Sequence, residues 1–248
     1  MSKRIVIVTG GSEGIGFSIA KRFLEDGDTV VITSRREAEG KKAERELQRF
    51  GTVEWMQTDV ANDESCRKLA DYVSEKYGRI DVLANNAGTV GKRGDLIDQD
   101  MENIRNVLNT NVMGVIQMTK YVALVMKQQS GGVIVNVGSL CGFVANPESI
   151  AYHSSKGAIR MFTQAAAREL SPFGIRVVSV APGWVATPLL RSVMKEEDMA
   201  YGASLHMQNK IIQPEQVAGA VFLLASEDAT AVNGTTLMVD DGYTSFKI

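Results

Sequence analysis

Tyr152 and Lys156 stand four residues apart in a segment whose apolar residues recur at helical spacing. On a helix, this spacing puts both side chains on one face, one turn apart. A phenol is a poor acid or base at neutral pH, but an adjacent ammonium group stabilises the phenolate and lowers the phenol pKa. The hydroxyl of Ser139, at the end of an apolar run, is placed to hold a substrate oxygen beside the phenol. These side chains predict proton transfer to or from an alcohol or carbonyl oxygen.

Such a pair also occurs on ordinary amphipathic helices, so the elements around it must decide. Short apolar, β-branched runs alternate with helical patterns along the whole chain. The runs are residues 5–8, 29–33, 53–57, 80–84, 132–137, 175–180 and 235–239, and the longer helical patterns are 37–50, 64–77 and 101–129. This rhythm predicts an α/β Rossmann fold, with a seven-stranded parallel doubly wound sheet and helices on both faces. No linker or charge block divides residues 1–248, which predicts a single dinucleotide-binding and catalytic domain.

A glycine-rich turn follows the first apolar run at once and leads into a helical pattern. It reads Thr9-Gly10-Gly11-Ser12-Glu13-Gly14-Ile15-Gly16. Glycines let the backbone approach a phosphate, and the helix N-terminus favours the anion. The turn therefore predicts a phosphate cradle.

Small and polar residues also follow the other runs, where doubly wound sheets bind their ligands. They are Ser34-Arg35-Arg36, Asp59-Val60, Asn85-Asn86-Ala87-Gly88, Gly138-Ser139 and Pro182-Gly183. Their gathering at one edge of the sheet indicates a nucleotide site and a reaction there.

The composition argues against several other classes of protein. The chain has 27 Lys+Arg against 29 Asp+Glu and a formal net charge of −2, which gives no electrostatic reason to expect nucleic acid or an anionic membrane. Two cysteines and two histidines show no metal-ligand spacing, so no metal site is predicted. No window approaches a transmembrane span, and the first apolar run is too short for a signal peptide. We therefore expect a cytoplasmic protein with no membrane partner.

In their order and spacing, these motifs resemble those of the short-chain dehydrogenase/reductase superfamily, and the resemblance covers essentially the whole chain. It implies an enzyme that interconverts a secondary alcohol and a ketone by hydride transfer with NAD(P). It also implies a catalytic set: Asn111, Ser139, Tyr152 and Lys156. In that set Tyr152 is the general acid in reduction and the base in oxidation, and Ser139 polarises the substrate oxygen. Lys156 lowers the Tyr152 pKa and holds the nicotinamide ribose, and Asn111 anchors a water that links Lys156 to solvent.

The resemblance further implies which residues contact the cofactor. Asp59 and Val60 are expected at the adenine, and Val185 and Thr187 at the carboxamide. The remaining expected contacts are Gly10, Ser12, Glu13, Gly14, Ile15, Gly16, Ser34, Arg35, Arg36, Asn86, Ala87, Gly88, Tyr152, Lys156, Pro182 and Gly183.

The end of the second run predicts a preference for NADP(H), with NAD(H) possible. NAD-selective sites carry an acidic residue there that binds the ribose 2′-hydroxyl, whereas this chain has Ser34, Arg35 and Arg36. Guanidinium groups suit the oxygens of a 2′-phosphate. Against this, Glu13 is expected near the same phosphate, and Glu37 can pair with an arginine. The alternative is that both arginines are solvated residues at a helix start.

Residues 188–212 are expected to form a variable lid over the active site. They are rich in apolar side chains: Leu189, Leu190, Val193, Met194, Met199, Tyr201, Leu205, Met207, Ile211 and Ile212. Methionine adapts to irregular apolar surfaces, which favours a bulky apolar alcohol or ketone such as a hydroxysteroid. Alternatively, the lid simply packs against the body. We also expect Ser139, Cys141, Tyr152 and Trp184 to line the substrate pocket, with Cys141 as a wall rather than a nucleophile, and His153 to face the surface or an interface.

Two other functions remain open. A 3-oxoacyl-thioester (acyl-carrier-protein) reductase would need a basic docking surface, and Lys120, Lys127, Arg160 and Arg168 make only a thin one. A non-catalytic nucleotide-binding redox sensor is the other alternative. The complete catalytic set argues against it.

The helical pattern at 101–129 and the one that follows Tyr152 carry apolar residues on more than one face. Such helices need burial on both sides. Because relatives pair these helices, we expect a homotetramer or a homodimer.

Overall fold

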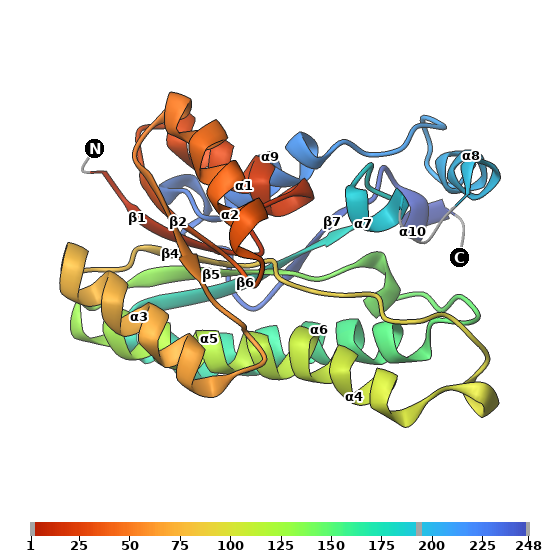
Figure 1. The fold of residues 1–248 in the computed structure, drawn as a ribbon, viewed down its shortest axis with the longest axis horizontal. Coiled ribbons are helices and arrows are strands. Elements are labelled where there is room, and N and C mark those ends of the chain that lie inside the picture. The colour runs from red at the N-terminus through yellow and green to blue at the C-terminus, as the bar shows by residue number, and fades with distance from the viewer. Residues whose placement is uncertain (1–2, 192–194, 247–248) are drawn as a thin grey trace.

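The computed structural model describes residues 3–191 and 195–246, and its strands form one sheet of seven parallel strands. The predicted fold class is confirmed (Figure 1). The strands are β1 (Ile5–Thr9), β2 (Thr29–Ser34), β3 (Val53–Gln57), β4 (Val82–Asn85), β5 (Gly132–Val137), β6 (Ile175–Pro182) and β7 (Thr236–Val239). Their order in the sheet is β3-β2-β1-β4-β5-β6-β7, so the direction of winding reverses between β1 and β4.

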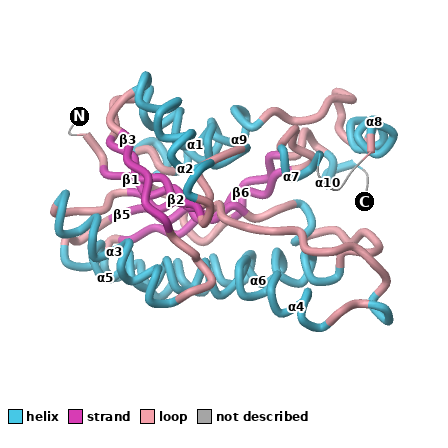
Figure 2. The backbone as a smooth tube through the Cα atoms, in the orientation of Figure 1, coloured by secondary structure: helices cyan, strands magenta, loops and turns pink. Residues whose placement is uncertain are grey.

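Helices cover both faces of the sheet (Figures 1 and 2). One face carries α1 (Gly14–Glu25), α2 (Glu37–Leu47) and α9 (Pro214–Leu224). The other carries α3 (Asp63–Tyr77), α4 (Met101–Leu108), α5 (Gly114–Gln128) and α6 (Ile150–Leu170). Three short helices, α7 (Pro188–Arg191), α8 (Glu196–Ser204) and α10 (Tyr243–Phe246), lie beyond the carboxyl ends of the strands.

Alternation along the strands divides the buried side chains between two cores. Val6 and Val8 of β1 join the core beneath α1, α2 and α9, whereas Ile5 and Ile7 join the core above α3, α5 and α6. Successive side chains of a strand point to opposite faces, so a strand buried on both faces reads as a continuous apolar run. That is why the inner strands were recognisable from the sequence, whereas the edge strands β3 and β7 are largely half-buried.

Two predicted elements differ in detail. Strand β4 begins at Val82 rather than at residue 80, because the Gln129 amide binds the Ile80 backbone: Ile80 N donates to Gln129 Oε1 at 3.1 Å and Gln129 Nε2 donates to Ile80 O at 2.8 Å. The helix predicted over 101–129 contains a π-helical turn at Asn109–Met113, between α4 and α5. π-helical turns are frequent at functional sites, and this one contains Asn111.

The loops that follow β1 and β4 are tied together at the reversal point. Asn86 Nδ2 donates to the carbonyl oxygens of Thr9 and Gly10, each at 3.0 Å. The Thr9 hydroxyl accepts from Asn86 N at 3.0 Å and Ala87 N at 3.1 Å. These bonds fix the glycine turn against the neighbouring strand, at the place where doubly wound sheets bind ligands.

Within the described part of the chain, no helix is both long and apolar enough to cross a membrane.

Candidate active site

A cavity of about 610 Å³ lies beyond the carboxyl ends of the strands and collects nearly all of the predicted site residues. Those that line it are Gly10, Ser12, Glu13, Gly14, Ile15, Ser34, Arg35, Arg36, Asp59, Val60, Asn86, Ala87, Gly88, Ser139, Cys141, Tyr152, Lys156, Pro182, Gly183, Trp184, Val185 and Thr187. Gly16 and Asn111 are predicted site residues that lie behind the cavity wall. One cavity thus joins the predicted phosphate cradle to the predicted acid–base pair.

The glycine turn has the backbone geometry of a cradle. Gly10 and Gly14 have φ of +64° and +57°, values that side chains disfavour. A Cβ on Gly16 would lie 2.2 Å from Gly10 O, so only glycine lets helix α1 begin this close to the turn. The Glu13 side chain makes no capping bond at the start of α1, and the first helical turn holds no acidic residue. The N–H groups there remain directed toward the cavity, as an anion site requires.

A buried hydroxyl points to a polar ligand at the same end of the cavity. Thr33 lines the cavity at the end of β2 and is only 1% exposed. Within residues 3–191 and 195–246, its Oγ1 is the buried side-chain oxygen or nitrogen that lacks a hydrogen-bond partner. Unpaired buried hydroxyls are costly, and a bound nucleotide offers a partner. The residues present therefore fit a dinucleotide.

The two arginines after β2 differ in their surroundings. Arg36 forms ion pairs of 3.4 Å with Glu13 and with Glu39. Arg35 is exposed and, among the described residues, its guanidinium enters no ion pair. Glu37 binds Lys41 at 2.6 Å, so the expected pairing of Glu37 with an arginine is wrong. Glu13 does compete for one arginine, as its place in the glycine turn suggested.

Trp55 of β3 organises the same corner, a role that the sequence did not indicate. Its indole Nε1 donates to Ser34 Oγ at 2.9 Å, and Ser34 Oγ donates to Arg36 O at 3.1 Å. A Cβ on Gly40 of α2 would lie 2.0 Å from Trp55 Nε1, so the glycine makes room for the indole. The Ser34 hydroxyl thus holds the loop that carries both arginines.

At the adenine end, Asp59 and Val60 line the cavity as expected. The Asp59 carboxylate accepts a hydrogen bond from Ala61 N at 3.0 Å, which shapes the turn after β3. Val60 is 7% exposed and packs where Gly114 at the start of α5 leaves space, since a Cβ there would lie 2.8 Å from Val60 Cγ2.

The acid–base pair lies on α6, opposite the end of β5. Lys156 Nζ lies 5.5 Å from the centroid of the Tyr152 ring and donates to Val137 O at 2.8 Å. Ser139 begins the turn after β5, and its Oγ accepts from Cys141 N at 3.1 Å. Ser139, Tyr152 and Lys156 all line the cavity. The four-residue spacing does put the phenol and the ammonium on one helix face.

The expected lowering of the Tyr152 pKa by Lys156 is not what the structure gives. Burial raises the pKa of the Tyr152 phenol, the nearby Cys141 thiol adds to the rise, and the hydrogen bond with Ser139 opposes it. Burial also lowers the pKa of the Lys156 amine to about 8. Withdrawal from water disfavours the charged form of both groups.

Asn111 braces the loop after β4 from behind the cavity. Its Nδ2 donates to Thr89 O at 2.8 Å and to Ser155 Oγ at 3.0 Å, and its Oδ1 accepts from Thr89 N at 2.8 Å. Ser155 Oγ in turn donates to Tyr152 O at 2.7 Å. The Asn111 side chain therefore ties this loop to helix α6.

The far end of the cavity is the expected substrate end. Cys141 and Trp184 line it, together with Leu189 of α7, Leu190 of α7 and Tyr201 of α8. Other lining residues escaped the sequence analysis because they lie in loops without a periodic pattern: Thr89, Val90, Arg93, Asn146, Pro147 and Ser149, with Asp198 of α8.

The lid contributes less to the cavity than its composition suggested. Met199, Leu205, Met207, Ile211 and Ile212 do not line it, and Ile212 is buried in the core beneath α9. Val193 and Met194 lie outside the described residues. In the second half of this segment Ile212 and His206 are buried against the body, as the alternative has it, whereas Met207 is 53% exposed.

His153 does not face open surface, contrary to expectation. It lines the cavity and closes the loop before α6: its Nε2 accepts from Asn146 N at 3.0 Å and its Nδ1 bonds Ser149 O at 2.8 Å. In the described part of the chain, no group of histidine, cysteine or acidic side chains is arranged to hold a metal ion.

Comparisons with known proteins agree with this geometry. Residues 10–244 match the family described as enoyl-(acyl carrier protein) reductase. A cyclopentanol dehydrogenase of Comamonas testosteroni is 35% identical over 249 residues, which covers 99% of this chain and 98% of the relative. An NADP-dependent (R)-specific alcohol dehydrogenase of Lentilactobacillus kefiri is 34% identical, over 98% of this chain and 97% of the relative. The solved structure of ElxO with NADP bound superposes with a TM-score of 0.91 at 33% identity, over 98% of this chain and 99% of that one.

Proposed function

The chain belongs to the short-chain dehydrogenase/reductase superfamily and is an NAD(P)-dependent oxidoreductase acting on CH–OH groups, and from this premise we propose that its substrates are bulky, apolar secondary alcohols and their ketones. Its cofactor is NADP(H), the nucleotide named for the Lentilactobacillus enzyme and bound in the solved relative. The observation that carries the proposal is the single cavity that Ser139, Tyr152 and Lys156 share with the glycine turn.

The residues of this chain have distinct parts in the proposed reaction. The α1 N-terminus and the glycine turn would hold the pyrophosphate, with Arg35 and Arg36 at the 2′-phosphate. When bound, the nicotinamide supplies or accepts the hydride. The cofactor roles expected for Asp59, Val60, Val185 and Thr187 are part of the same proposal.

Proton transfer falls to the α6 pair. A phenol carries its proton at neutral pH, so Tyr152 can give that proton to the oxygen of a ketone as negative charge develops there. Ser139 Oγ holds the same oxygen. Lys156, whose pKa of about 8 lies close to neutrality, can exchange protons with solvent and so replace the one that Tyr152 gives up. In oxidation the same steps run in reverse.

The walls of the substrate end support an apolar substrate. Leu189, Leu190, Trp184 and Pro147 present carbon surface to the cavity, and Cys141 forms the wall beside Ser139. The Comamonas relative is named for an alicyclic secondary alcohol. We propose an alicyclic substrate of this kind, from a substituted ring up to a hydroxysteroid.

A second candidate is reduction of a 3-oxoacyl thioester, because the matching family description names an acyl carrier protein. The basic surface for such a carrier is thin, and its cations are partly engaged. Lys127 lies over the Phe173 ring at 4.3 Å and Arg160 over the Phe143 ring at 4.4 Å. We rank this candidate second.

The test is to mix the protein and NADPH with cyclic ketones, a steroid ketone and an acetoacetyl thioester, and to follow the loss of reduced-nicotinamide absorbance. We expect the cyclic and steroid ketones to have the higher kcat/KM. A preference for the thioester would replace the first candidate with the second. Binding of NADPH without turnover of any compound would overturn both and leave the redox sensor.

We also propose that residues 1–248 act as one domain with a lid at about 188–212, and that the chain assembles as a homotetramer or homodimer. Leu124 of α5 and Met161 of α6 are 55% and 61% exposed, and Met101 at the start of α4 is 55% exposed. Large apolar side chains on neighbouring helices favour a protein partner over water. Sedimentation as a monomer at micromolar concentration would contradict the assembly.

A further inference from the structure

His206 is a buried histidine, far along the chain from the catalytic residues, whose ring nitrogens are both engaged. It is 1% exposed. Nδ1 bonds the carbonyl oxygen of Lys210 at 2.6 Å, and Nε2 lies 3.2 Å from the backbone nitrogen of Trp184. Because a carbonyl only accepts and a backbone N–H only donates, Nδ1 carries the proton and Nε2 accepts. The imidazole is thus held as one neutral tautomer between two backbone groups.

Two glycines make room for the contacts between these segments. A Cβ on Gly183 would lie 2.6 Å from His206 Nε2, and a Cβ on Gly202 of α8 would lie 2.4 Å from the Trp184 ring. Such approaches are closer than any side chain allows, so the imidazole lies on one glycine and the indole on the other. We call these four residues, Gly183, Trp184, Gly202 and His206, the lid clasp.

The backbone beside the clasp is joined to the lid as well. Ile212 N donates to Trp184 O at 2.9 Å, and Ala186 N donates to Ile212 O at 2.9 Å. Both backbone groups of Trp184 are therefore bound by residues of the 206–212 segment. The second half of the lid is fixed to the end of β6 by specific bonds, rather than by apolar packing alone.

The clasp also determines where the substrate-facing part of the lid lies. Asp198 and Tyr201 line the cavity from α8, and Gly202 of the same helix rests on the Trp184 ring, which lines the cavity too. Ser139 and Lys156 lie elsewhere, on the turn after β5 and on α6, and bind Cys141 N and Val137 O. A change in the clasp should move the substrate walls and leave the proton-transferring groups in place.

We propose that His206 is a positioning residue: by holding Trp184 against Gly202 it sets the shape of the substrate end of the cavity, and so determines the affinity for the ketone rather than the rate of proton transfer. This inference rests on the proposed ketone reduction. It assigns a purpose to a buried histidine that the catalytic set does not use.

The kinetic test compares His206→Leu, His206→Gln and Gly202→Ala. Leucine removes both hydrogen bonds, whereas glutamine keeps a planar donor and acceptor. For His206→Leu, which leaves the Trp184 N–H and the Lys210 carbonyl without their partner, we expect KM for the ketone to rise about tenfold. For Gly202→Ala, whose added Cβ would displace the Trp184 ring, we expect a rise of similar size. In both variants kcat should change less than about threefold. His206→Gln should stay within about threefold of wild type in both. Gly219→Ala is the matched control, because a Cβ there meets nothing within 4 Å.

A second measurement does not depend on turnover. The chain has two tryptophans, so Trp55→Phe leaves Trp184 as the sole emitter. In that background we expect His206→Leu and Gly202→Ala to shift the emission to the red, because the ring gains contact with water, and His206→Gln to leave the emission unchanged. If wild-type protein reduces no ketone, the proposed function fails, and the emission alone then decides whether the clasp exists. Unshifted emission, or a wild-type KM in the leucine and alanine variants, would overturn the proposal.

Discussion

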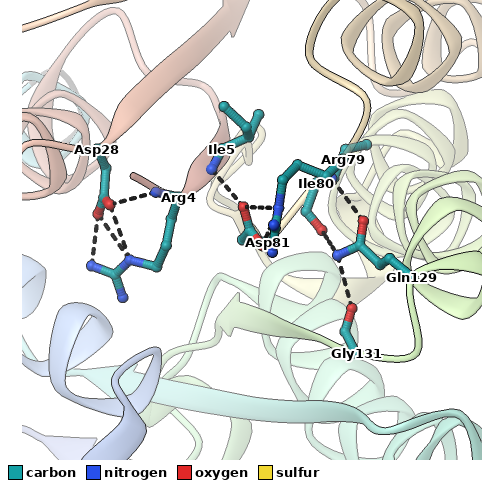
Figure 3. Close-up of polar contacts among 8 residues, drawn as sticks. All are labelled: Arg4, Ile5, Asp28, Arg79, Ile80, Asp81, Gln129 and Gly131. Atoms are coloured by element: carbon teal, nitrogen blue, oxygen red, sulfur yellow. Dashed lines mark hydrogen bonds and ion pairs between the residues drawn. The ribbon is translucent and has the colours of Figure 1, made fainter. Parts of the chain in front are cut away.

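At the amino ends of the strands, polar side chains bind one another and the backbone (Figure 3). The Asp28 carboxylate receives the Arg4 guanidinium, with Nη2 at 2.6 Å, and Asp81 accepts from Ile5 N at 2.7 Å. Gln129 binds both backbone groups of Ile80. At the carboxyl ends, by contrast, the start of α1 lacks a side-chain cap and Thr33 Oγ1 lacks a partner.

The difference between the two ends separates stability from function. Polar groups that hydrogen-bond one another stabilise the strand ends and leave few unpaired donors or acceptors for a ligand. Groups left partly unsatisfied in the chain alone cost stability until a ligand supplies their partners. Substitutions at the amino end should therefore change the free energy of unfolding, and substitutions at the carboxyl end should change binding or turnover.

The largest effect is expected for Tyr152→Phe at the carboxyl end. Removal of the phenolic hydroxyl takes away the proposed general acid, and positioned acids typically contribute ~10²–10⁴-fold to the rate. We expect kcat to fall by that factor while NADPH still binds, as measured by steady-state kinetics and by cofactor fluorescence. Tyr121→Phe, which removes a hydroxyl bound to Asp63 on the surface, is the control. Activity within a few-fold of wild type would refute the assignment.

The next effect concerns the arginines after β2. Arg35→Ala/Arg36→Ala should lower the preference for NADPH over NADH by about ten- to a hundredfold, because each charge-assisted bond to a phosphate is worth roughly 1.5–3 kcal/mol. Arg35→Ala alone should exceed Arg36→Ala, since Arg36 is already paired with Glu13 and Glu39. The measurement is kcat/KM with both cofactors.

Arg45→Ala on α2 is the matched control for charge, because it removes an exposed arginine of the same helix. An unchanged ratio in the double variant would mean that the two arginines are only solvated residues at the start of α2, the alternative considered from the sequence.

At the amino end, Gln129→Leu should lower the free energy of unfolding and leave activity unchanged. Loss of the amide leaves the backbone groups of Ile80 and the carbonyl of Gly131 without their partner, which costs about 1–3 kcal/mol of unfolding free energy. Urea unfolding measures this, and kcat/KM should stay unchanged. Gln128→Leu, on the exposed side of the same helix end, should leave both unchanged. A fall in kcat/KM without a loss of stability would contradict the division between the two ends.

This comparison also shows where the sequence was informative. The inner strands of the sheet were predictable because burial on both faces leaves continuous apolar runs. The glycine turn was predictable because Gly10, Gly14 and Gly16 follow directly after one of these runs. Polar residues after the strands did not by themselves identify the ligand-binding edge of the sheet. Asp28 and Asp81 lie at the opposite edge, and only the structure shows that their carboxylates already bind Arg4 and the Ile5 backbone.

Other features depend on contacts between segments far apart in the chain. His206 binds Trp184, 22 residues earlier, and Trp55 binds Ser34, 21 residues earlier. No periodic pattern in the sequence predicts either contact. The direction of the Tyr152 pKa shift was predicted wrongly from the sequence, because helical spacing identifies the neighbour on the same helix face but not how deeply the phenol is buried. Such properties belong to the packed structure, and pattern alone does not predict them.

The smallest effect is expected for Thr33→Val. It is also the most discriminating, because the free energy of unfolding and the Kd for NADPH should change independently. Thr33→Val keeps the shape of the side chain and removes the unpaired Oγ1. In the chain alone this should leave the free energy of unfolding unchanged or raise it, because a buried hydroxyl without a partner is costly. If the bound nucleotide supplies the partner, the Kd for NADPH should rise about two- to tenfold, the value of one hydrogen bond of 0.5–1.5 kcal/mol.

Thr9→Val provides the contrast within the same sheet edge, since Thr9 Oγ1 already accepts from Asn86 N and Ala87 N. Its loss should lower the free energy of unfolding, as at the amino end. Urea unfolding without nucleotide and titration with NADPH separate the two variants. A destabilised Thr33→Val with an unchanged Kd would mean that the hydroxyl is satisfied within the protein, by a bound water. Thr33 would then belong with the self-satisfied groups of the amino end, although it stands at the carboxyl end of β2.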